Sequence, residues 1–173
     1  MQVRYRNTLE HIVALQKFVL RNTAFGKKMM VHRFMMVEII IFLICLLFVF
    51  NHNPIKVLIG FIALSGLAWI FRERSVLMQF KKDFKREDRR DESGTFHKDR
   101  VLSIDPNGFT IRSGAGETAC GWDQVDLIGN DTKYIYIVLK SVLHHVVPLS
   151  AFSDREESDQ FLTAMRTFQS NPS

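Results

Sequence analysis

The chain has 173 residues, of which 47% are hydrophobic and 24% are charged, and its mean hydropathy is near zero. These averages are typical of a soluble globular domain, but they combine two unlike segments. Residues 34–71 contain two charged side chains, whereas residues 72–92 contain fourteen. The composition therefore excludes a wholly soluble globule, and the patterned apolar stretches exclude a disordered chain.

The net charge of +5 is divided unevenly along the chain. Residues 1–94 carry 16 basic and 8 acidic side chains, a net charge of +8, and residues 95–173 carry 7 and 10, a net charge of −3. Because the basic residues flank apolar segments and the folded C-terminal part is acidic, we expect no binding of nucleic acid. Cys45 and Cys120 are too few to form a disulfide framework or a metal site.

An N-terminal amphipathic helix is expected within residues 1–30. Residues 8–25 place their apolar side chains broadly on one face, which predicts a helix that packs on the later charged helix or lies on the inner leaflet. The segment lacks the short apolar region and cleavage site of a removable signal peptide.

Residues 31–71 predict a membrane hairpin of two helices, at 34–50 and 55–71. Each is 17 residues of nearly unbroken apolar character, and with its flanks each approaches the ~20 residues that span a bilayer. The turn between them ends in Pro54, a residue that suits the first position of a helix, so the helices are expected to be antiparallel neighbours. A buried hairpin of a soluble protein is the alternative, but so short a chain offers little to cover it.

Basic residues at the outer flanks predict the orientation of this hairpin. Lys and Arg accumulate before the first span and after the second, and the turn has none before Lys56, so both termini are expected to be cytoplasmic. The candidate lipid-facing basic residues are Lys27, Lys28, Arg33, Arg72, Arg74, Lys81 and Lys82.

Glu38 is an acidic residue inside the first span, and with Arg72 it forms a candidate intramembrane polar site. Antiparallel pairing places Glu38 level with about Leu67, within reach of Arg33, Arg72 or Ser65. Anchoring or packing is the favoured role. The alternative is a transport or channel component, which must be an oligomer because two helices cannot enclose a path.

Small residues recur every third position in the second span, at Gly60, Ala63 and Gly66. Such a face allows close approach of another helix. We expect it to pack the hairpin on itself, and a homo-oligomer is the alternative.

Residues 72–92 predict a charged juxtamembrane helix that continues the second span without Pro or Gly. Val76, Phe80 and Phe84 form a narrow apolar stripe on it. Acidic residues interleave with its lysines and arginines, which favours a solvated, internally paired face over the binding of anionic lipid.

From residue 95 the period changes to two, which predicts a cytosolic domain over 95–173 built from short antiparallel strands. The strand at 132–140 is apolar on both faces, so we expect it to be central and covered on both sides. Ser153 and Glu156 match a capping box for an amphipathic helix at 154–169. The expected strands lie at 101–104, 108–113, 117–121, 132–140 and 144–147.

This order of elements predicts a membrane α-helical hairpin followed by an α+β domain, a small antiparallel β-barrel or sheet like that of pleckstrin-homology (PH) domains, capped by a C-terminal helix. The runs 122–125, 134–137, 146–148 and 151–152 (WDQV, YIYI, VVP and AF) resemble the C-terminal domain of the YcxB-like family. The resemblance implies a bacterial inner-membrane protein with an N-terminal helix, two transmembrane helices and a cytosolic PH-like domain. It implies no reaction, and Leu149 stands where the family commonly has a basic residue.

No residue pattern predicts an active site, so we expect neither an enzyme nor a cofactor. The glycines at 114–116 lack the ending of a phosphate loop, and the adjacent His144 and His145 point to opposite faces of a strand. The favoured function is the recruitment or regulation of a protein partner, through a sheet edge or the face around Trp122, although core packing is the favoured role of Trp122 itself. Sensing of anionic lipid by the basic helices is a further alternative.

Overall fold

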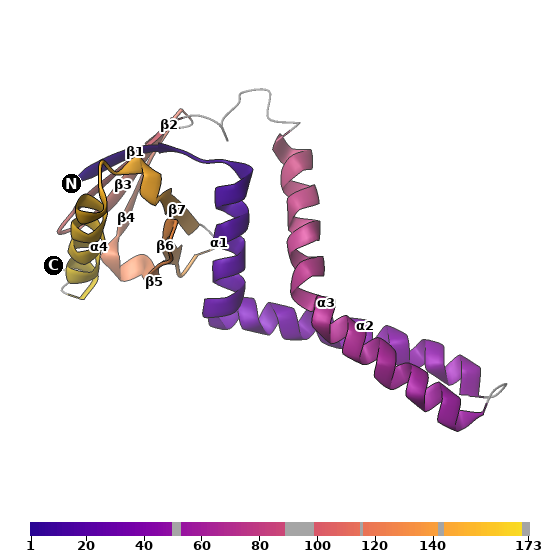
Figure 1. The fold of residues 1–173 in the computed structure, drawn as a ribbon. Coiled ribbons are helices and arrows are strands. Elements are labelled where there is room, and N and C mark those ends of the chain that lie inside the picture. Colours follow the sequence, from indigo (N-terminus) through magenta and orange to yellow (C-terminus); the bar gives the residue numbers. More distant parts are fainter. Residues whose placement is uncertain (50–52, 89–98, 115, 142–143, 171–173) are drawn as a thin grey trace. The chain divides into compact units, whose positions relative to one another are not determined.

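The structure is a computed structural model that describes residues 1–49, 53–88, 99–114, 116–141 and 144–170 (Figure 1). By its contacts the chain forms two units, one of residues 1–18 with 83–173 and one of residues 19–82. The elements in chain order are β1 (Gln2–Arg6), α1 (Leu9–Asn22), α2 (Ala24–Val49), α3 (Pro54–Asp88), β2 (Asp99–Asp105), β3 (Gly108–Ser113), β4 (Gly116–Gly121), η2 (Trp122–Gln124), β5 (Val125–Asn130), β6 (Tyr134–Leu139), β7 (His144–Pro148), η3 (Leu149–Ala151) and α4 (Arg155–Ser170).

Helices α2 and α3 form the predicted antiparallel pair, and α3 starts at the predicted proline. Their aromatic rings meet edge to face, Phe34 with Trp69 at 5.1 Å and Phe42 with Phe61 at 6.3 Å between centroids. Both helices are long and apolar enough to span a membrane, and no residue in the apolar stretch of either helix is buried. The unburied apolar surface indicates a membrane protein.

The helix expected at 8–25 ends earlier, because Thr23 separates α1 from α2. The Thr23 hydroxyl donates to the carbonyl of Val19 at 2.8 Å and accepts the N–H of Gly26 at 2.9 Å, so one side chain closes α1 and caps α2. A Cβ atom at position 26 would collide with the backbone of Val19 and Leu20. The close turn between the helices therefore requires glycine there.

The β-strands form two open antiparallel sheets, in the orders β1-β2-β3-β4 and β5-β6-β7 (Figure 1). The short helix η2 joins β4 to β5 in place of a hydrogen-bonded ladder, so the described strands do not close into the barrel that the sequence analysis allowed. One hydrophobic core includes side chains from both sheets and from α4, among them Leu102, Phe109, Ile137, Val147, Phe161 and Met165.

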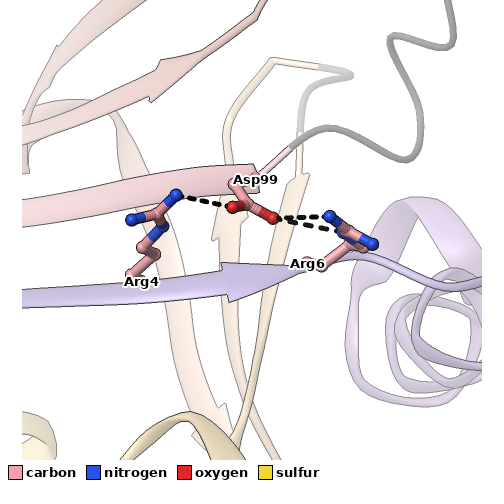
Figure 2. Close-up of polar contacts among 3 residues, drawn as sticks. All are labelled: Arg4, Arg6 and Asp99. Carbon is pink, nitrogen blue, oxygen red and sulfur yellow. Dashed lines mark hydrogen bonds and ion pairs between the residues drawn. The ribbon is translucent and has the colours of Figure 1, made fainter.

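Strand β1 was not predicted, since residues 1–30 were assigned to a helix. It pairs antiparallel with β2 and buries Val3 and Tyr5 in the core. On its other face, Arg4 and Arg6 both donate to the carboxylate of Asp99, at 2.7 and 3.1 Å (Figure 2). The two membrane-length helices are therefore an insertion between neighbouring strands of one sheet.

Strand β6 lies at the centre of its sheet with all six residues buried, as predicted. Ile135 and Ile137 belong to the core on one face. On the other face, the ring of Tyr136 stacks on Phe18 of α1 at 4.2 Å between centroids, and Gly129 of β5 lies directly against the ring of Phe18. Residues 9–18 thus cover the second face of this sheet.

Helix α4 begins one residue later than predicted, and its capping box is shifted with it. The N–H of Glu157 donates to Asp154 Oδ1, and the N–H of Ser153 donates to Glu157 Oε2, both at 2.7 Å. Glu157 thus takes the place predicted for Glu156, and its carboxylate accepts from Ser153, the residue before the cap, and not from Asp154 itself. The apolar stripe of the helix, with Phe161, Leu162 and Met165 buried, is as expected.

Candidate functional site

Glu38 lies against α3 and is bound by one hydroxyl. Ser65 Oγ donates to Glu38 Oε2 at 2.7 Å, two residues from the level predicted for the contact. The other oxygen, Oε1, is buried and has no hydrogen-bond partner among the described residues. A carboxyl group in apolar surroundings gains from such a bond, because an unsatisfied polar atom is costly there. The pair can hold the two helices in register.

Arg72, the second residue of the candidate intramembrane site, is not brought to Glu38. Its guanidinium carbon lies 3.7 Å from the ring centroid of Trp69 on the same helix. Arg33 is also engaged elsewhere and donates to Gln79 Oε1 at 2.7 Å. An arginine stacked on tryptophan is typical of a membrane–water interface, so the geometry favours an anchoring role for Arg72.

The other candidate lipid-facing residues, Lys27, Lys28, Arg33, Arg74, Lys81 and Lys82, are all exposed, and Arg72 is half-buried. Nearby, Arg21 of α1 forms a bidentate ion pair with Glu73 of α3. Lipid contact by these residues stays a prediction.

The small-residue face of α3 does not pack the hairpin on itself. A Cβ atom at Gly60 or Gly66 would have no neighbour within 4 Å, and Ala63 is exposed. The contact with α2 is made instead through Phe61 and Ser65. The face of α3 that carries Phe61 and Ser65 is therefore the one turned towards α2, and the face with Gly60, Ala63 and Gly66 is not.

Trp122 was a candidate for the interaction surface, but the structure places it in the core with 3% of its surface exposed. Its indole N–H donates to the carbonyl of Asp105 at 2.8 Å, and its ring contacts Phe109 and Phe168. This burial agrees with core packing, the role that the sequence favoured for Trp122, and the interaction surface around it stays a prediction.

Strand β4 presents a free edge. Residues 116–119 are exposed in succession, and no described strand pairs with the side of β4 away from β3. The edge of β5 differs, because Gln169 of α4 donates to the carbonyl of Val125. At the end of β4, burial raises the pKa of the Cys120 thiol, which makes it a poor nucleophile.

The two adjacent histidines have different partners. His144 Nδ1 accepts the N–H of Leu139 at 3.3 Å, and His145 lies with its ring edge to Phe109. Burial, with smaller contributions from Arg100 and His144, lowers the pKa of His145 to about 4. Within the described ranges no group of three His, Cys, Asp or Glu residues is placed to hold a metal ion.

Comparison with known proteins identifies part of the β-domain. No match was found among curated proteins or among solved structures. The family model described as YcxB-like protein matches residues 104–165, which run from the end of β2 into α4 and include neither β1 nor the helices α2 and α3. This part of the chain is therefore similar to YcxB-like proteins, in agreement with the motifs that suggested the resemblance.

Proposed function

We propose that this is a non-catalytic protein of the bacterial inner membrane whose β-domain binds a protein partner at the cytoplasmic surface. Support for the membrane comes from the two apolar helices inserted between β1 and β2, and support for the orientation from the basic flanks of the hairpin. The family match over residues 104–165 and the order of a four-stranded sheet, a three-stranded sheet and a closing helix support a PH-like assignment of the domain.

The free edge of β4 is the observation that carries the proposed binding role. An unpaired edge strand presents backbone N–H and C=O groups that an extended peptide can pair with. Thr118 and Ala119 have short, exposed side chains that leave this backbone accessible. The longer side chain of Glu117 is held by Arg112 of β3, at 2.9 Å, and is thereby directed towards its own sheet.

Photo-crosslinking from the edge tests this proposal. A photoreactive amino acid replaces Thr118 in the full chain, expressed in its native membrane, and a matched variant carries it at Asp126, which is exposed on β5. We expect an adduct of one defined mass from position 118 and none from position 126. Equal labelling from both positions, or no adduct from position 118, would refute binding at the edge.

A second candidate function rests on the buried, unpartnered Oε1 of Glu38. A carboxyl group that accepts only one hydrogen bond inside the membrane can exchange a proton, and an oligomer of this chain would then form a transport path. Glu38→Gln should abolish proton or ion flux in proteoliposomes, whereas Ser65→Ala should reduce it. Unchanged flux in Glu38→Gln would eliminate this function.

A further inference from the structure

A groove of about 360 Å³ lies between the β5–β6 turn, η3 and the first turns of α4. Its floor is apolar and is formed by Ile135, Phe152 and Leu162, which are buried, together with the half-buried Leu149. The groove is distinct from the free edge of β4, since no residue of β4 lines it.

The rim of this groove is acidic. Asp131, Asp154 and Asp159 line it, and Arg155 is its one basic lining residue. The Arg155 side chain is 93% exposed, and its Nε lies 4.0 Å from Asp159, so it neutralises the rim weakly. The lining therefore carries a formal net charge of −2, three carboxylates against one guanidinium, and Lys133 next to the groove acts on the carboxylate of Asp131.

Two of these carboxylates are fixed in place by hydrogen bonds. Asp131 accepts the backbone N–H groups of Lys133 and Tyr134 and the hydroxyl of Tyr136, all at 2.7–2.8 Å. Asp154 caps α4 through the N–H of Glu157. Because that N–H is already taken by Asp154, the positive end of the helix dipole is offset, and an anion has no advantage at this site.

We propose that this groove binds a segment of the partner protein that carries an arginine or lysine beside an apolar side chain. The inference rests on the proposed function and adds the chemistry of the partner. The aliphatic part of a basic side chain suits the apolar floor, and its charge meets the acidic rim. Anionic lipid and nucleic acid are repelled by the same rim. A bare metal ion lacks a cluster of ligands among the described residues.

A photoreactive tripeptide tests the proposal on the full chain in nanodiscs of zwitterionic lipid. The probe is acetyl-Leu-Arg-Leu-amide with a diazirine on its first leucine, and the matched probe carries Glu in place of Arg. We expect adducts of the Arg probe within residues 130–135 and 149–162, which contain the residues that line the groove, competed by the unlabelled peptide, and none from the Glu probe. Labelling elsewhere, or equal labelling by both probes, would overturn the proposal.

Charge reversal separates a specific groove from general attraction. Asp159→Lys places a positive charge, the same sign as that of the probe's arginine, at the rim. It should reduce labelling by the Arg probe about tenfold or more. Asp126→Lys makes the same change in net charge at an exposed residue of β5 outside the groove, and should leave labelling within about twofold. Equal losses in both variants, or no loss in Asp159→Lys, would refute the groove. If the groove is refuted but the photoreactive residue at position 118 still gives its adduct in the native membrane, the partner binds at β4 and not in the groove.

Discussion

Burial of His145 makes the stability of the β-domain depend on pH. Burial holds its pKa at about 4, against 6.5 for an unperturbed histidine, and the positive charges of Arg100 and His144 act in the same direction. As the pH falls below about 6.5, the unfolded chain binds a proton that the folded chain does not bind until about pH 4. The free energy of unfolding should therefore fall by roughly 3 kcal/mol in all between pH 6.5 and pH 4, and this contribution should change no further below pH 4.

Urea unfolding of the full chain in non-ionic detergent measures this effect at pH 7.5 and 4.5. Trp122 reports on the core if Trp69→Phe removes the other tryptophan of the chain. Because carboxylates also titrate over this range, the useful quantity is the difference between variants. From pH 7.5 to 4.5, the free energy of unfolding of His145→Gln should fall by about 2–3 kcal/mol less than that of the parent. His144→Gln should show the same fall as the parent. Full pH dependence in His145→Gln would refute the assignment.

Three further predictions concern packing and polar contacts. Gly129→Ala should destabilise the domain by about 1–3 kcal/mol through collision with Phe18, and a thermal scan should show the loss vanish in a Phe18→Ala background; a persistent loss would contradict the contact. Trp122→Phe should lower the urea midpoint by the equivalent of about 1–2 kcal/mol, because the carbonyl of Asp105 loses its donor, and an unchanged midpoint would argue against that bond. Asp99→Asn removes the negative charge shared by the two arginines of β1. Its small effect on Tm should disappear at high salt, and an effect that salt leaves unchanged would exclude an ionic origin.

The elements that could be predicted from the sequence are those whose apolar and polar pattern lies within one short stretch of the chain. The hairpin follows from two apolar runs and a four-residue turn, and the level of Glu38 was predicted within two residues of its partner Ser65. The strand at 134–139 follows from strict alternation with apolar side chains on both faces, which requires cover on each side. Local chemistry decides these elements, so a single sequence is enough.

Elements that depend on distant partners were not predictable in the same way. In β1, Val3 and Tyr5 alternate with Arg4 and Arg6, which is a strand signal, but its partner Asp99 lies 95 residues from Arg4. Five residues of alternating apolar and polar character before a helix do not predict a strand until the strand that pairs with them is known. The covering of Tyr136 by Phe18 was missed for the same reason.

The free edge of β4 and the groove beside α4 depend on which strands remain unpaired and how η3 meets the helix. Sequence periodicity gives the faces of a strand but does not give its neighbours. The position of the α4 cap shows a smaller ambiguity, since Ser153 with Glu156 and Asp154 with Glu157 are overlapping capping patterns. Only the structure selects the second pair.

The insertion of α2 and α3 between β1 and β2 also sets an order for biogenesis. Strand β1 leaves the ribosome before both apolar helices and has no neighbour in its sheet until β2 has been synthesised after them. Val3 and Tyr5 therefore cannot be buried against β2 before the hairpin has emerged and become available for membrane insertion. Completion of the β-domain thus follows synthesis of its own anchor.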